Sequence, residues 1–170
     1  MFRRIADELK SSYNSTSDDV SQTFYNRVLS ESVLYKRVSG YFSSKALAQY
    51  ADGLDKLFDK HGEARFIIST QISEEDMSDI KTGYEVRSDG ESLTEDDKKC
   101  LGNLAFMIGN GSVSIKFGLS STGIFHSKWG LFEDKINDGD VVYFMGSNNE
   151  TEQALERNYE AVSYTHLTLP

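Results

Sequence analysis

Two side chains that can act on a phosphate group lie two residues apart, at His126 and Lys128. An imidazole can attack phosphorus or transfer a proton, and an ammonium group can bind phosphate oxygens and offset their charge. The residues around them, from about 124 to 132, have the composition of a β-strand. Alternate residues of a strand project from one face, so we expect His126 and Lys128 to lie side by side.

A second polar group ends the next predicted strand, at residues 141–147. Gly146 allows close backbone approach, and Ser147 and Asn149 are short side chains suited to contacting the oxygens of an anion. Residues 150–157 are predicted to form a helix whose free amides point towards the same place. Taken singly, each feature is more often structural than functional. Their joint order and spacing indicate a phosphate-binding site.

The pair His126-x-Lys128, followed by Gly146-Ser147-x-Asn149, resembles the HxK…GSxN signature of the phospholipase D superfamily. The likeness is strong over residues 124–161. It implies a phosphodiesterase, and more specifically a nuclease that acts on DNA. It also implies an α/β fold in which a mixed sheet is flanked by helices.

Two further stretches carry the same resemblance more weakly. Thr151, Ala154, Asn158 and Glu160 fall where nucleases of that superfamily show a similar pattern downstream. Residues 39–44 (Ser-Gly-Tyr-Phe-Ser-Ser) resemble the first strand-to-helix junction of members with a single motif. Such members are notably fused to helicases in restriction and defence systems, so we expect a helicase domain as a fused partner.

The sequence departs from the motif at one position. The full family motif is HxKxxxxD, and Glu133 stands where the aspartate is expected, with Asp134 beside it. In the family that aspartate is mainly structural. Glu133 can fill the role, and so can Asp134 after a one-residue bulge.

The resemblance implies a two-step phosphoryl transfer that needs no metal and no cofactor. His126 attacks phosphorus and forms a phosphohistidine, while Lys128, Asn149 and Ser147 hold the non-bridging oxygens. Glu160 resembles the acid that hydrogen-bonds the histidine and fixes its tautomer.

A second histidine must protonate the leaving oxygen, and the chain has only two others, His61 and His166. His61 lies at a predicted helix end before Gly62, where a capping or solvated role is expected. His166 lies in a terminal segment of doubtful origin. Because only one HxK motif is present, we predict a homodimer in which two copies of His126 face each other across the two-fold axis.

Helices and strands alternate early in the chain, and strands follow one another later, which is typical of an α/β fold with a mixed sheet. Helices are predicted at about 20–30 and from Ser43 or Ser44 to Lys60. Further helices are predicted after the capping pairs Ser73/Asp76 and Thr94/Asp97. The remaining strands are predicted at 33–41, 65–69 and 112–117. The strand at 65–69 is apolar enough for a sheet covered on both faces.

Composition narrows the possible functions. The 18 basic and 27 acidic residues give a net charge of −9, which argues against gripping nucleic acid by bulk charge but not against a local basic pocket. No apolar run approaches the roughly 18 residues of a membrane span, and no membrane partner is expected. A single cysteine excludes an internal disulfide and a Cys-rich zinc site, which fits a cytoplasmic setting.

Residues 162–170 resemble the in-frame translation of a transposase-type sequencing adapter. We therefore expect residues 1–161 to be a phospholipase D-like domain that is truncated at its C-terminal end and belongs to a longer protein. The alternative is a genuine strand, since Val-Ser-Tyr-Thr has good β propensity.

Three functional hypotheses follow. The leading one is a metal-independent nuclease that acts on DNA. The second is a catalytically silent module for DNA binding or dimerisation, which the acidic charge and Glu133 favour. The third is a lipid phosphodiesterase, which ranks low because no interfacial membrane helix is predicted.

Overall fold

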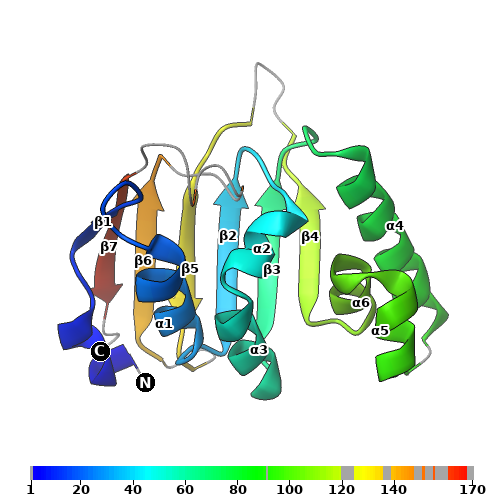
Figure 1. Ribbon diagram of the computed structural model, residues 1–170, viewed down its shortest axis with the longest axis horizontal. Coiled ribbons are helices and arrows are strands. Elements are labelled where there is room, and N and C mark those ends of the chain that lie inside the picture. Colours follow the sequence, from blue (N-terminus) through cyan, green and yellow to red (C-terminus); the bar gives the residue numbers. More distant parts are fainter. Residues whose placement is uncertain are drawn as a thin grey trace.

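Seven strands form one mixed sheet in the computed structural model, which describes residues 2–90, 92–119, 125–135, 139–147, 151, 155 and 161–167 (Figure 1). The strands are β1 (Ser12–Asn14), β2 (Leu34–Ser39), β3 (Glu63–Ile68), β4 (Val113–Phe117), β5 (Trp129–Glu133), β6 (Val141–Gly146) and β7 (Ala161–Leu167). Their order across the sheet is β1-β7-β6-β5-β2-β3-β4. β2, β3 and β4 are parallel, whereas the other neighbours are antiparallel. The predicted α/β class with a mixed sheet is confirmed.

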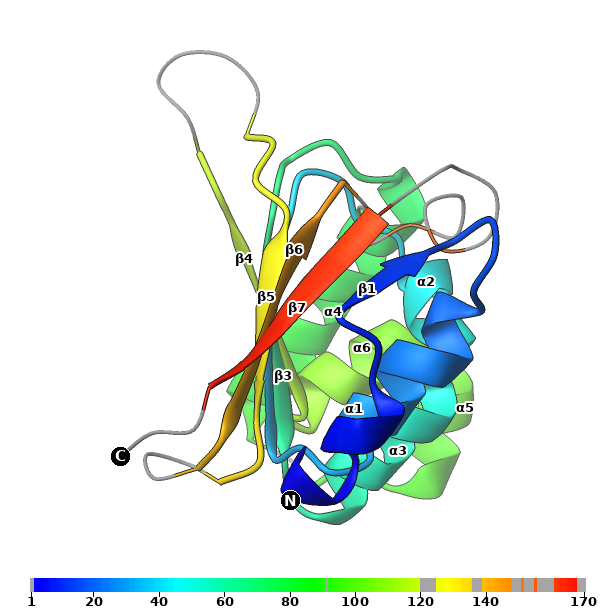
Figure 2. The same cartoon turned by 90° about the vertical axis from the view of Figure 1, so that its left-hand side faces the viewer.

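The α-helices of the described residues lie on one face of the sheet (Figure 2). They are α1 (Arg27–Leu29), α2 (Ser44–Gln49), α3 (Ala51–Asp59), α4 (Glu74–Asp89), α5 (Glu95–Leu101) and α6 (Asn103–Gly109). Two 3-10 turns, η1 (Phe2–Arg4) and η2 (Ala6–Glu8), and a π-helical segment, η3 (Ser21–Asn26), precede them. No helix in the described part is long and apolar enough to cross a bilayer.

The predicted helix starts are confirmed by their caps. The Ser43 hydroxyl accepts a hydrogen bond from the Lys45 amide, and the Ser73 hydroxyl accepts one from the Asp76 amide at 3.0 Å. Thr94 and Asp97 form the complete reciprocal capping box. The buried Asp76 carboxylate also accepts a hydrogen bond from the Ser44 amide at 3.1 Å, so one side chain joins the starts of α2 and α4.

Two predicted helices are each divided in two. The helix expected to reach Lys60 breaks at Tyr50, whose φ and ψ of −127° and 35° are not helical. The fully buried ring of Tyr50 stacks on Tyr25 with a centroid distance of 4.9 Å. The helix that follows Thr94 breaks at Gly102, whose φ of 79° suits glycine.

Aromatic side chains fill the space between the sheet and the helices. Tyr35 of β2 stacks on Phe132 of β5 with ring centroids 4.6 Å apart, and Phe132 stacks on Phe144 of β6 at 5.2 Å. Phe24 of η3 meets Phe144 edge to face. All four side chains are fully buried, so this cluster forms the centre of the core.

The opposite face of the sheet carries no helix in the described residues, and we call it the open face (Figure 2). A row of paired residues crosses it: Met145, Trp129, Val38 and Ile67. Ile67 is 41% exposed and alternates with the buried Phe66 and Ile68. The expectation that this strand is covered on both faces was wrong, because Ile67 is exposed and the helices of the described residues lie on the other face.

The segment expected to be foreign forms strand β7, between β6 and β1. Its register places His166 opposite Val142 and Val162 opposite Tyr13. A segment rich in β-branched and aromatic residues forms a strand whatever its origin, so this pairing does not test the expectation.

Candidate functional site

His126, Lys128, Gly146 and Ser147 lie at the edge of the sheet where β2, β3, β4 and β6 end and β5 begins, here called the upper edge (Figure 1). Trp129, the first residue of β5, pairs with Val38 of β2 and Met145 of β6. His126 and Lys128 come just before it, in an irregular segment. The expectation that both lie within a strand was wrong, because pairing between β2 and β5 ends at Val38.

His126 and Lys128 are in direct contact. The Lys128 Nζ lies 2.9 Å from Nδ1 and 3.0 Å from Nε2 of His126, and it donates to the His126 carbonyl oxygen at 3.2 Å. An ammonium group donates hydrogen bonds and accepts none, so a ring nitrogen with a free lone pair can accept one from Lys128. The His126 side chain is exposed. An accessible imidazole with a cation beside it is suited to nucleophilic attack on a phosphate.

The segment that carries His126 packs closely against two glycines that follow strands. A Cβ atom on Gly118, which follows β4, would lie 2.9 Å from the ring of Phe125. A Cβ on Gly40, which follows β2, would lie 3.1 Å from the Cα of His126. The Gly118 amide donates a hydrogen bond to the Ile68 carbonyl oxygen at 2.7 Å, which holds Gly118 beside the end of β3.

Gly146 and Ser147 reach the same edge from β6. Trp129 pairs with Met145, so Lys128, just before β5, and Gly146, at the end of β6, each lie one residue beyond this pair. Ser147 follows Gly146 and is exposed. Asn149 and Glu160, the other two predicted site residues, lie outside the described residues.

Glu133 and Asp134, the two candidates for the motif aspartate, lie at the opposite end of β5. Glu133 accepts a hydrogen bond from Lys36 Nζ at 2.8 Å, which forms an ion pair between β5 and β2. Asp134 accepts hydrogen bonds from the amides of Phe2 and Asp140, both at 3.0 Å. Asp134 therefore has the contacts expected of a structural aspartate, whereas Glu133 forms an ion pair between strands.

The other two histidines do not reach the upper edge. His61 follows α3, has a φ of 57°, and lies just before β3 begins. This is the edge of the sheet opposite to the upper edge, here called the lower edge. It is exposed, as predicted for a capping or solvated position. The backbone of His166 pairs with Val142 near the beginning of β6, which is also at the lower edge. Neither residue is placed to act with His126 in the same chain.

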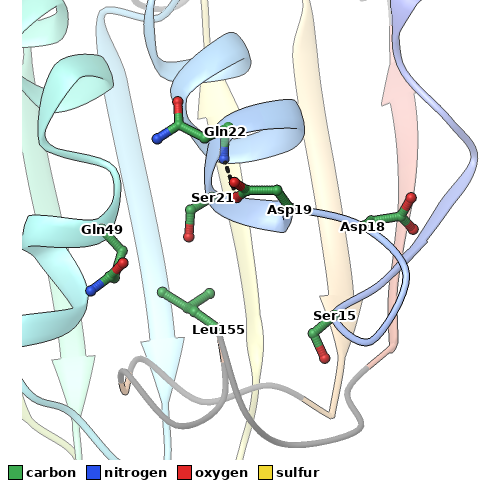
Figure 3. Close-up of a pocket in the computed structure, with 7 residues that line it drawn as sticks. All are labelled: Ser15, Asp18, Asp19, Ser21, Gln22, Gln49 and Leu155. Atoms are coloured by element: carbon green, nitrogen blue, oxygen red, sulfur yellow. Dashed lines mark hydrogen bonds between the residues drawn. The ribbon is translucent and has the colours of Figure 1, made fainter.

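A polar pocket of about 240 Å³ lies between η3, the end of α2 and Leu155 (Figure 3). Its lining residues are Ser15, Asp18, Asp19, Ser21, Gln22, Gln49 and Leu155. The hydrogen bond from Lys10 holds the pKa of the Asp18 carboxyl below its usual range, and the Asp19 carboxylate caps η3 by accepting from the Gln22 amide at 3.0 Å. Because both carboxylates carry negative charge, they repel an anion, and this pocket is unsuited to an anionic substrate.

Comparisons with known proteins identify other structures that share this fold. No protein-family model and no curated protein matches the sequence. NucT from Helicobacter pylori is 13% identical with a TM-score of 0.55, covering 91% of this chain and 82% of that chain. Nuc from Salmonella typhimurium, described as a phospholipase D family member, is 13% identical with a TM-score of 0.51, covering 94% and 82%.

Yeast tyrosyl-DNA phosphodiesterase is 10% identical with a TM-score of 0.50 over 82% of this chain, and the match spans only 27% of the yeast chain. Identities this low establish the fold alone. The fold is therefore phospholipase D-like, as the sequence predicts.

Sequence reasoning missed Gly40 and Tyr41, which contact His126, and the packing of Phe125 on Gly118 beside it. A signal was present for two of them. The Ser-Gly-Tyr at positions 39–41 resembles a family junction, but nothing local to it indicates contact with a histidine so far along the chain.

Proposed function

We propose that this chain is a phosphodiesterase domain that cleaves DNA through a covalent phosphohistidine at His126, without a metal ion. The observation that carries the proposal is the contact between the Lys128 ammonium and the ring nitrogens of an exposed His126 at the upper edge. The phospholipase D-like fold supports it, because two of its structural neighbours are described as a phospholipase D family member and a tyrosyl-DNA phosphodiesterase.

In the first step, a ring nitrogen of His126 attacks phosphorus, the nitrogen–phosphorus bond forms, and the bond to the leaving oxygen breaks. A second histidine donates a proton to that oxygen. In the second step, water attacks phosphorus and gives a proton to the second histidine, and the nitrogen–phosphorus bond breaks, which regenerates His126. Lys128, with Ser147 and Asn149, holds the non-bridging oxygens through both steps. Glu160 fixes the histidine tautomer.

The position of Lys128 implies an exchange of partners when substrate binds. Its Nζ lies beside both ring nitrogens, and His126 needs the lone pair of one of them for attack. A phosphodiester oxygen is a stronger acceptor than a neutral imidazole because it carries charge. Bound substrate therefore draws the ammonium from the ring to the phosphate, which frees the nucleophile.

The second histidine comes from a second copy of the chain. His61 and His166 lie at the lower edge, away from His126. The large hydrophobic side chains exposed in the described residues support a partner surface near the upper edge, since all of them lie at or near the ends of β3, β4 and β6. They are Ile67, Phe117, Leu119 and Met145. A homodimer that covers them brings two His126 side chains together.

The test is cleavage of labelled single- and double-stranded DNA in the presence of EDTA. The unsubstituted chain should cleave, His126→Ala should be inactive, and His61→Ala should retain full activity. Mixing the unsubstituted chain with excess His126→Ala should lower activity below the share of unsubstituted chain, because mixed dimers lack one histidine. Cleavage that survives in His126→Ala, or that EDTA abolishes, would refute the proposal. DNA binding without cleavage would instead support the silent module.

We further propose that residues 1–161 are the N-terminal domain of a longer helicase-type protein, and that residues 162–170 derive from an adapter. Residues 39–44 resemble a junction in family members that are fused to helicases, and residues 162–170 resemble a translated adapter; these likenesses support the proposal. Sequencing the gene from genomic DNA past the codon for Ala161 tests it. A genome that encodes Val162 to Pro170 in frame would contradict the adapter origin.

A further inference from the structure

The turn that follows β2 meets the segment that carries His126. A Cβ atom on Gly40 would lie 3.0 Å from Cδ2 and 3.1 Å from Cα of His126, and 3.2 Å from the Phe125 carbonyl oxygen. These distances are shorter than a methyl group normally tolerates, so glycine lets the His126 backbone rest directly on β2. Any side chain at Gly40 would move the imidazole away from the sheet.

Tyr41 contacts the imidazole itself. The rings of Tyr41 and His126 have centroids 5.8 Å apart and planes at 88°, which is an edge-to-face pair. In this arrangement the positive edge of one ring meets the negative face of the other. Because the geometry depends on the angle between the rings, the contact restricts rotation of the His126 side chain.

Ser39 connects this turn to the core. Its fully buried hydroxyl donates a hydrogen bond of 2.6 Å to the Tyr41 carbonyl oxygen. This bond closes the turn across Gly40 and holds the backbone of Tyr41. Ser39 is itself fixed in β2, where it pairs with Ile68 of β3.

Lys128 contacts the edge of the imidazole that carries both ring nitrogens, rather than the plane of the ring. Its Nζ lies 2.9 and 3.0 Å from the two ring nitrogens, so it does not favour one over the other. His126 also lies in an irregular segment, which imposes no rotamer through a helix or strand. The Tyr41 ring therefore adds a contact that depends on the angle of the imidazole plane.

We infer that Tyr41 is a positioning residue that orients the His126 imidazole for attack, and that Gly40 sets the distance of the imidazole from the sheet. This inference rests on the proposed function of His126. Misplacing a reacting group by about 1 Å can lower a rate by about a hundredfold. Orientation by Tyr41 should therefore affect kcat rather than KM.

The first experiment observes His126 without substrate. The chain has three histidines, so their imidazole signals are readily resolved by NMR, and the signal lost in His126→Ala identifies His126. Tyr41→Leu should shift the His126 signal and leave the other two in place, because the ring-current field of Tyr41 is lost. Tyr41→Phe keeps the ring and should leave all three nearly unchanged. Tyr143→Leu, a half-buried tyrosine of the open face, is the matched control.

The second experiment measures DNA cleavage. Tyr41→Leu and Gly40→Ala should each lower kcat by about tenfold or more with little change in KM, and Tyr41→Phe should restore nearly full activity. Circular dichroism confirms that each variant is folded. If Tyr41→Leu does not fold, Gly40→Ala provides the same tests of signal position and kcat.

The outcomes separate the two claims. An unshifted His126 signal, or unchanged kcat, in folded Tyr41→Leu overturns the positioning role. Tyr41→Phe as impaired as Tyr41→Leu also overturns it, because the hydroxyl rather than the ring would then matter. Full cleavage by His126→Ala refutes the proposed function instead, whatever the NMR signals show.

Discussion

The ring of Phe144 lies directly over Gly130 of the neighbouring strand. A Cβ atom on Gly130 would lie 2.5 Å from both Cε1 and Cζ of that ring. The Arg37 guanidinium carbon lies 5.0 Å from the centroid of the same ring, and Arg37 pairs with Gly130 across β2 and β5. The absence of a side chain at Gly130 therefore creates the space that Phe144 occupies between the strands.

Gly130→Ala should destabilise the fold although alanine suits a strand better than glycine does. The added methyl group must displace a fully buried ring, and overpacking of this kind costs on the order of 2 kcal/mol. The free energy of unfolding in urea measures the effect. Phe144→Leu in the same chain should relieve part of the penalty, so the double variant should be more stable than the sum of the single changes predicts. A fully additive pair would contradict this packing.

Asp134 should contribute more to stability than Glu133. Asp134→Ala leaves the amides of Phe2 and Asp140 without their acceptor and should cost about 1–3 kcal/mol. Glu133→Ala removes a partly exposed ion pair with Lys36 and should cost below about 1 kcal/mol. Urea unfolding of both variants decides which acid has the structural role of the motif aspartate. Equal costs would argue against Asp134.

Local patterns in the sequence predicted local structure. The caps at Ser43, Ser73 and Thr94 were confirmed, because a cap depends on residues within one helical turn. The helix break at Tyr50 was not predicted, since it accompanies stacking on Tyr25 from another segment. The one-sided sheet was also missed, because Phe66-Ile67-Ile68 has no polar residue to mark its open face.

The candidate site could be predicted in part. The spacing of two residues predicted that His126 and Lys128 lie side by side, and the two side chains are in contact in the structure. The segment that carries them is not a strand, because strand formation depends on how far β2 and β6 extend beside it. Gly40 and Tyr41 could not be connected to His126 from the sequence, because only the sheet brings the end of β2 to that segment.

Asp79 gives α4 a pH-dependent contribution to stability. Burial, followed by the charges of Asp76 and Glu75, raises the pKa of the Asp79 carboxyl above its ordinary value. The folded state then holds this proton more tightly than the unfolded state, so the stability from the protonated form is complete below about pH 3.9 and is lost as the pH rises through the folded pKa.

Asp79→Asn should therefore increase the free energy of unfolding at pH 7, by less than about 1 kcal/mol because the group is partly exposed to solvent. The gain should disappear near pH 3, where the Asp79 carboxyl is protonated in both states. Urea unfolding at both pH values measures the difference, with Asp55→Asn on the exposed side of α3 as the control. A gain that persists unchanged at pH 3 would show that the carboxylate charge is not responsible.

Lys128 should be required for cleavage beyond its positive charge. Lys128→Met removes the group that binds the phosphate and should lower kcat by about 10²–10³, the usual effect of losing one preorganised donor. Lys128→Arg keeps the charge, but its planar fork does not reproduce the ammonium contacts with the His126 ring and carbonyl, so it should restore activity only in part. Lys116→Met, an exposed lysine of β4, controls for the loss of charge. Full activity in Lys128→Arg would assign Lys128 an electrostatic role alone, and full activity in Lys128→Met would exclude it from the site.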